Sequence, residues 1–81
     1  MVAQARLILL GRLEDVAGTA ELAVAPGLLD AILAELPADW ALALRDPRVR
    51  LALNGNLLAP DATITLIAGD ELAFLPPVSG G

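Results

Sequence analysis

The residues with the most distinctive chemical pattern close the chain, in the stretch FLPPVSGG. Gly80 and Gly81 carry no side chain, so the backbone there is thin enough for a narrow channel and adopts conformations that other residues resist. Pro76 and Pro77 lack amide donors and fix φ, which ends sheet pairing and extends the following residues as a stiff spacer. We therefore expect the terminus to enter the active site of another protein. The inserting segment is predicted to comprise Pro76, Pro77, Val78, Ser79 and Gly80.

The predicted reactive group is the α-carboxylate of Gly81. Its reference pKa of about 3.3–3.7 leaves it ionised at neutral pH, and an ionised carboxylate is a poor electrophile. ATP can activate it as an acyl-adenylate, after which a sulfur donor can leave a thiocarboxylate on the same carbon. Because the sequence has no cysteine, any sulfur that it carries must be carried there. The alternative is a frayed end without function, but the strand-like segment and two prolines in front of the glycines favour a working terminus.

The residue types that the sequence lacks exclude most catalytic mechanisms that this chain could carry out alone. The sequence has no Cys, His, Lys or Tyr. This removes thiolate, imidazole and Schiff-base chemistry, the usual zinc ligands and the lysine of a phosphate-binding loop. Carboxylates remain, but no spacing indicates an opposed catalytic pair. We therefore expect no self-contained active site, no metal site and no cofactor bound by this chain.

Charge and hydropathy indicate which classes of partner the chain is expected to bind. Ten acidic residues against five arginines give a net charge of −5, and Trp40 and Phe74 are the only aromatic residues, so we expect no nucleic-acid partner. Basic partners suit the charge better, although a mild acidic excess is also ordinary for solubility. The apolar runs are far shorter than the roughly 20 residues of a membrane-spanning helix, and the N-terminus lacks the order of a signal peptide. The sequence predicts a cytoplasmic protein with no membrane partner.

The rest of the chain must position this terminus, and its hydrophobic periodicity predicts one small domain. Apolar residues alternate with the period of a strand at residues 3–10, 21–25, 49–53 and 71–75, and a short return strand begins at Leu57. Apolar residues recur at helical spacing over 28–36, where Pro37 ends the helix, and over the shorter segment 40–44. Residues 11–20 are predicted to be a connection between two hairpin strands, and NGN and Gly69-Asp70 are turn signals.

This order of elements predicts an α+β fold of the β-grasp type, in which a mixed sheet packs on one main helix. Residues 1–75 would form the β-grasp domain, and residues 76–81 would form an extended, flexible C-terminal tail. The face of the sheet opposite the helix is expected to carry apolar side chains. This predicted partner-binding patch consists of Ile8, Leu10, Ala52, Leu57, Ala73 and Leu75.

Two interpretations of that patch remain open from the sequence. Single exposed hydrophobic residues are normal, and an error of one residue in a strand would reverse every facing. The alternative is a contiguous surface reserved for another protein, where each fully buried aliphatic side chain would contribute roughly 1.5–3 kcal/mol.

The stretch GDELAFLPPVSGG resembles, almost throughout, the C-terminus of the small, sulfur-carrier subunit of molybdopterin synthase, a member of the ubiquitin-like β-grasp sulfur-carrier family. The segments DWALALRD and the LN of LALNG are also similar to the middle of that subunit. The resemblance covers the whole chain in length and element order, and the tail is its most specific part.

The resemblance implies a sulfur carrier in molybdenum cofactor biosynthesis. Gly81 would be adenylated by an E1-like adenylyltransferase that uses ATP, and then converted to a thiocarboxylate. The tail would insert into the large synthase subunit, where the sulfur is transferred to cyclic pyranopterin monophosphate. That subunit would supply the catalytic side chains in a heterotetramer of two small and two large subunits. The chain itself would then be a non-catalytic sulfur-donor subunit of a sulfurtransferase complex.

Three other functions fit parts of the sequence. The sulfur carrier of thiamine synthesis also ends in Gly-Gly, and a ubiquitin-like modifier would use the same activated tail to join lysines of other proteins. The absence of lysine here forbids self-linked chains of such a modifier but permits conjugation to targets. A plain binding module would use the apolar sheet face and leave its terminus inert.

Overall fold

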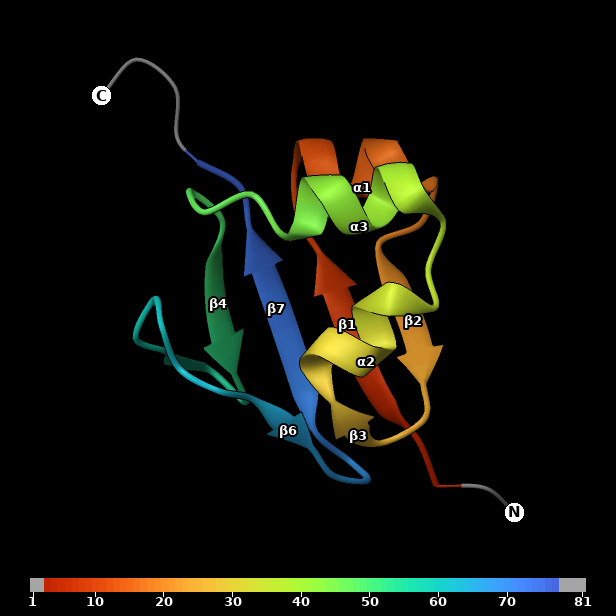
Figure 1. Cartoon of the computed structure of the whole chain (residues 1–81), viewed down its shortest axis with the longest axis vertical. Coiled ribbons are helices and arrows are strands. Elements are labelled where there is room, and N and C mark those ends of the chain that lie inside the picture. The colour runs from red at the N-terminus through yellow and green to blue at the C-terminus, as the bar shows by residue number, and fades with distance from the viewer. Residues whose placement is uncertain (1–2, 78–81) are drawn as a thin grey trace.

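The computed structural model describes residues 3–77, which form a mixed sheet with helices packed on one face (Figure 1). The strands are β1 (Ala5–Leu9), β2 (Glu21–Val24), β3 (Gly27–Leu28), β4 (Arg50–Leu53), β5 (Asn56–Leu57), β6 (Thr65–Leu66) and β7 (Glu71–Leu75). The helices are α1 (Arg12–Ala17), α2 (Leu29–Ala34) and α3 (Ala38–Leu44). Within this part of the chain no helix is long and apolar enough to cross a membrane.

The main sheet has the strand order β2-β1-β7-β4-β5. Strands β1 and β7 run parallel, while β1 with β2, β7 with β4 and β4 with β5 are antiparallel. A separate two-stranded ladder joins β3 and β6. This is a mixed sheet with its helices gathered on one face, so the predicted α+β class is confirmed.

The core lies between the sheet and the helices. Alternate residues of β1 and β7 are fully buried, among them Leu7, Leu9, Leu72 and Phe74. The helices cover them with side chains that are less than one tenth exposed: Leu13, Leu29, Ile32, Leu33 and Leu44. Because the period of a strand is two, burying these residues turns their neighbours in β1 and β7 to the other face of the sheet.

The prediction of a plain connection at residues 11–20 is wrong, because α1 forms inside it. Leu13 is only 4% exposed and Ala17 is half-buried against the core, one helical turn later. The helix ends at Gly18, whose φ of 74° suits a glycine and whose N–H bonds the carbonyl of Glu14. Such a short amphipathic turn between two glycines is stabilised by packing on the core, which the local pattern does not show.

The predicted main helix over residues 28–36 is shorter in the structure, and a helix of similar length follows it. Helix α2 spans only Leu29–Ala34, and α3 begins at Ala38, two residues before the predicted start of the second helix. Pro37 occupies the N-cap of α3 with φ of −50°, so it begins a helix as well as separating it from the previous one. The helical layer is therefore made of short pieces and does not cover the sheet as one long helix would.

The two predicted turns are present and are joined to each other. Asn54 and Gly55 adopt φ of 49° and 85° between β4 and β5, as a tight hairpin turn requires. The Asn54 side chain donates to Asp70 Oδ1 at 3.0 Å and accepts the Glu71 N–H at 2.9 Å. Asp70 also accepts the Ile67 N–H, and this bond, followed by the one from Asn54, lowers the pKa of Asp70.

Candidate functional site

The predicted tail is anchored in the middle of the main sheet. Strand β7, which leads into it, lies between β1 and β4, with Leu9 paired to Phe74 and Arg50 paired to Leu75. The carbonyl of Phe74 also accepts the Leu10 N–H at 3.3 Å. The chain leaves the sheet beside the end of β1 and the beginning of β4 (Figure 1). A central strand with neighbours on both sides gives the tail a fixed point of departure.

The first residues of the tail pack on the domain. Pro76 and Pro77 are half-buried, whereas the sequence predicted a spacer projecting from its start. A Cβ placed on Gly11 would lie 3.0 Å from Pro76 Cγ, so the proline ring rests against the bare backbone of this glycine. Gly11 also has φ of 55° and ψ of −130°, a conformation that residues with a side chain rarely adopt. We call Gly11 and Pro76 the tail seat.

The other predicted tail residues, Val78, Ser79, Gly80 and the reactive Gly81, lie outside the described residues. The structure therefore defines where the tail begins and which surface surrounds that point. Among residues 3–77, no group of three or more His, Cys, Asp or Glu side chains is placed to hold a metal ion.

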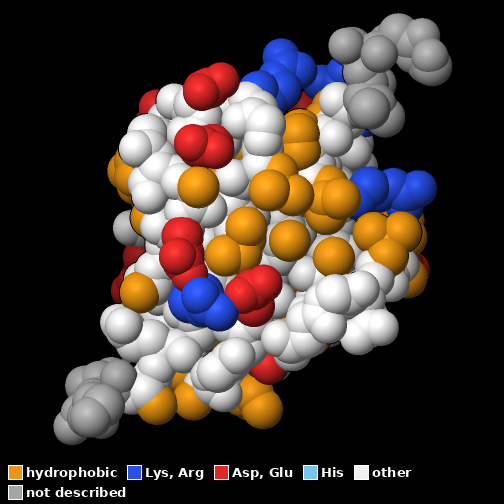
Figure 2. Space-filling view, turned by 180° about the vertical axis from the view of Figure 1, so that it is seen from behind, with side chains coloured by type: hydrophobic (Ala, Val, Ile, Leu, Met, Phe, Trp, Pro, Cys, Tyr) orange, Lys and Arg blue, Asp and Glu red, His pale blue; other side chains and the backbone are white. Residues whose placement is uncertain are grey.

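The predicted patch residues lie on the sheet face away from the helices. The register places Ile8 beside Ala73, Ala73 beside Ala52 and Ala52 beside Leu57, so one apolar row crosses β1, β7, β4 and β5. Leu10 and Leu75 extend the row toward the tail seat. Figure 2 shows this face, with apolar side chains gathered at its centre and charged side chains around them. We call these six residues the sheet-face patch.

Exposure differs along the sheet-face patch. Leu57 is 62% exposed and Leu10 is 40% exposed. The other four members are half-buried by their neighbours on the sheet. The patch is therefore a shallow apolar surface with its most accessible side chain on the edge strand β5.

Charged residues border the sheet-face patch at both ends. Arg6 lies two residues before Ile8 in β1 and bridges Glu21 at 2.5 Å and Glu71 at 2.6 Å, on the strands at either side. At the other end, near the tail seat, exposed Arg50 is paired in register with Leu75.

Sequence reasoning missed these border residues and Gly11. The positions of the two arginines could have been predicted, because Arg6 and Arg50 each stand two residues from a patch residue and so lie on the same face of the sheet. The role of Gly11 could not be predicted, since it depends on contact with Pro76, which is 65 positions away in the sequence (76 minus 11).

Comparison with known proteins gives relatives by sequence and relatives by structure. By sequence, the chain is similar to the "Molybdopterin synthase sulfur carrier subunit" of Escherichia coli strain K12, to which it is 50% identical over 42 residues, which are 52% of this chain and 49% of the relative. The protein with the same name from Haemophilus influenzae is 41% identical over 49 residues, which are 60% of this chain and 58% of that protein. These alignments span about half the length of the curated relatives.

Two solved structures that match this chain cover nearly all of it. The crystal structure of small archaeal modifier protein 1 from Haloferax volcanii has a TM-score of 0.70 and 31% identity over 96% of this chain and 99% of that one. The solution structure of the protein of the same name from Methanosarcina acetivorans has a TM-score of 0.71 and 26% identity over 100% and 99% of the two chains. These likenesses confirm the predicted ubiquitin-like β-grasp fold.

The match to a protein family includes the predicted tail. Residues 7–81 match the model of the ThiS family, so the match begins in β1 and runs through both terminal glycines. Together with the named relatives, this confirms the resemblance to the β-grasp sulfur carriers that the tail motif indicated. The chain belongs to the ThiS family.

Proposed function

We propose that the chain is the sulfur carrier of molybdopterin synthase. The observation that carries this proposal is the continuity of the FLPPVSGG segment with β7, the central strand of a ThiS-family domain. Relatives that share 50% and 41% identity over about half their length bear the name of that subunit. The described domain provides an anchor and a docking face, and the proposed chemistry takes place at Gly81.

The proposed reaction has three steps. The Gly81 carboxylate oxygen attacks the α-phosphorus of ATP and releases pyrophosphate, which gives an acyl-adenylate. A sulfur donor at the oxidation level of sulfide then attacks the carbonyl carbon and displaces AMP, leaving the thiocarboxylate. In the third step the thiocarboxylate sulfur forms a bond to a carbon of cyclic pyranopterin monophosphate and displaces an oxygen substituent from that carbon. Water then cleaves the bond between sulfur and the acyl carbon, which leaves the sulfur on the pterin as a thiolate and restores the Gly81 carboxylate. ATP is used by the activating partner, and this chain binds no cofactor of its own.

The sheet-face patch supports a docking role in this proposal. Its apolar row begins beside the tail seat, so a protein that binds it also receives the tail. The proposed occupants are the large synthase subunit, in a heterotetramer, and, at a different time, the E1-like adenylyltransferase. Both must reach the same terminus, so they are expected to compete for this face.

A second function has a specific observation in its favour. Three solved structures that cover 94% or more of the chain are of small archaeal modifier protein 1. A modifier would use the same acyl-adenylate but pass the acyl group to an amine of another protein. Its product would be an amide bond between Gly81 and a target lysine.

Intact mass spectrometry tests the carrier proposal directly. The protein is incubated with ATP, the E1-like enzyme and a sulfur source, and the expected result is a mass gain equal to the replacement of one oxygen by sulfur. A variant without Gly81 is the control and should gain nothing. An unchanged mass in the full chain, with the enzyme active on another substrate, would contradict the proposal, and lysine-linked conjugates without a thiocarboxylate would support the modifier instead.

A further inference from the structure

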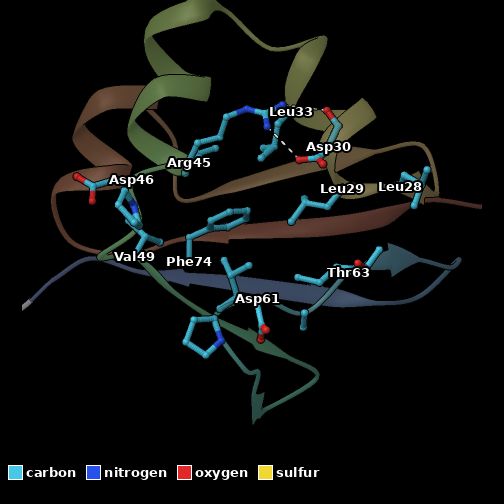
Figure 3. A pocket seen from close by; sticks show the side chains of 16 residues that line it. Leu28, Leu29, Asp30, Leu33, Arg45, Asp46, Val49, Asp61, Thr63 and Phe74 are labelled. Atoms are coloured by element: carbon cyan, nitrogen blue, oxygen red, sulfur yellow. Dashed lines mark hydrogen bonds and ion pairs between the residues drawn. The ribbon is translucent and has the colours of Figure 1, made fainter.

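A hollow opens on the helical side of the sheet, opposite the sheet-face patch. It has a volume of about 540 Å³ and lies between α2, the end of α3 and the segment 60–64 (Figure 3). Its apolar lining includes the half-buried Val49 and Leu51, and beside them Leu33, Leu44, Ile64 and Phe74, which are less than one tenth exposed. This volume is within the range of about 300–1,000 Å³ that is typical of binding pockets.

The hollow exists because the helical layer is short. Helix α2 has six residues and α3 has seven, and in Figure 1 neither lies over β4. The segment 60–64 approaches from the opposite side but leaves the space between open. The lining residues Leu51 of β4 and Val49 before it are only half-buried as a result.

The charges around the hollow favour a cation over an anion. The lining residues include three carboxylates, Asp30, Asp46 and Asp61, and one guanidinium, that of Arg45. Arg45 is already engaged, since it bonds Asp30 Oδ1 at 3.0 Å and the Asp30 carbonyl at 3.1 Å. Asp46 is paired with Arg48 at 2.9 Å. Asp61 makes no ion pair among the described residues, so it is the carboxylate left to receive a cation.

The shape of the hollow indicates a protein ligand. Asp30, Arg45, Asp61 and Thr63 at its rim are exposed, so a free small molecule seated there would keep much of its surface in water. Leu28 adds an apolar side chain that is 53% exposed. A protein segment can bury this rim at the same time as one of its side chains fills the hollow.

We propose that this hollow binds a basic segment of another protein, in which a lysine or arginine stem lies against Val49 and Leu51, its charge meets Asp61 and a neighbouring apolar residue covers Leu28. The inference does not rest on the proposed sulfur chemistry. Lining residues Leu51 and Phe74 alternate along their strands with members of the sheet-face patch, so the two surfaces lie on opposite faces of the sheet. One protein can therefore occupy the hollow while another occupies the patch.

Chemical-shift mapping by NMR tests this with defined probes. The isotopically labelled full chain is titrated with the blocked peptide acetyl-Leu-Arg-Leu-amide and, in parallel, with acetyl-Leu-Glu-Leu-amide. We expect saturable shifts at amides of segments 28–33 and 61–64 with the arginine peptide only. Asp61→Asn should weaken that binding by about threefold, the size of a surface ion pair. Asp15→Asn, on an exposed residue of α1 that does not line the hollow, is the matched control and should leave it unchanged.

Three results would overturn the proposal. Equal binding of the glutamate peptide would show that Asp61 does not select a basic ligand. The absence of saturable shifts in both segments would show that the hollow does not bind the peptide. Binding of butylguanidinium alone as tightly as the arginine peptide would identify a small-molecule pocket in place of a protein-binding one. None of these outcomes depends on Gly81, so failure here is distinguishable from failure of the carrier proposal.

Discussion

At the scale of single residues, the tail seat depends on what Gly11 lacks. Replacement by alanine would place a Cβ 3.0 Å from Pro76 Cγ in a backbone conformation at φ of 55°. The strained conformation should cost about 1–3 kcal/mol of unfolding free energy, which urea denaturation measures. Because the ring of Pro76 must move, we also expect a lower rate of thiocarboxylate formation.

Gly18→Ala is the matched control for that variant. Gly18 also has a positive φ, of 74°, but a Cβ there would meet nothing within 4 Å. It should therefore lose stability, by about 1–2 kcal/mol, and keep the normal rate of thiocarboxylate formation under conditions where both variants are folded. Equal rates in the two variants would show that contact between Gly11 and Pro76 does not position the tail.

A second prediction at this scale concerns Asp46 and acid stability. Hydrogen bonds from the Arg48 side chain, and then from its backbone N–H, lower the pKa of Asp46 from 3.8 to about 2. A carboxylate with a depressed pKa in the folded state stabilises the fold above its unfolded value and loses that contribution as pH falls through the folded value. The urea midpoint of the native protein should therefore decline between pH 3.8 and about 2.

Asp46→Asn and Arg48→Leu test the cause of this decline. Asp46→Asn removes the carboxylate, and Arg48→Leu removes the side-chain hydrogen bonds while keeping the one from the backbone N–H. Each variant should therefore lose less stability than the native protein over that pH interval, and Asp46→Asn should lose the least. Chemical denaturation at the two ends of the interval measures the difference. A decline of the same size in the native protein and both variants would assign the acid sensitivity to other carboxyl groups.

At the scale of elements, the edge strand β5 presents the most exposed member of the sheet-face patch. Leu57→Asp should weaken binding to the large synthase subunit by about tenfold or more, because an aliphatic side chain buried at an interface contributes roughly 1.5–3 kcal/mol. Titration calorimetry with that subunit measures the change. The fold should be unaffected, since Leu57 is 62% exposed.

Ile67→Asp provides the control for docking. Ile67 is 65% exposed, nearly the same as Leu57, but it follows β6 and lies outside the patch. Its replacement should leave the affinity unchanged. If both variants bound equally well, the sheet-face patch would not be the docking surface.

The elements also show how far a single sequence can be interpreted. Strands β1, β4 and β7 follow from strict alternation, as in Leu7, Leu9 and the residues between them, and the patch followed from the same alternation. Helix α1 could not be predicted in this way, because it contains only one buried residue, Leu13, and a single position shows no helical periodicity. The hollow and the tail seat were also missed, since each is formed by segments distant in sequence whose approach depends on tertiary packing.

At the scale of the whole molecule, the net charge of −5 should act on encounter with partners. If the partner surface is basic, the association rate should fall as salt rises from 0.01 to 0.15 M, where the Debye length shortens from about 30 to about 8 Å. The dissociation rate should change much less, because contacts in the sheet-face patch are apolar. Stopped-flow binding to the large synthase subunit measures both rates, and an association rate independent of salt would exclude steering by charge.

The central position of β7 has a consequence for how the protein is made. The ribosome produces β1 early and β7 last among the described strands, yet β7 separates β1 from β4 in the sheet. The pairing of Leu7 with Leu72 closes a loop of 65 residues (72 minus 7), and contacts so distant in sequence form slowly. A nascent chain that stops before β7 lacks the strand on which both halves of the sheet assemble. Only a chain that has been translated through β7 can therefore fold, and such a chain is also the only one that can go on to display the tail.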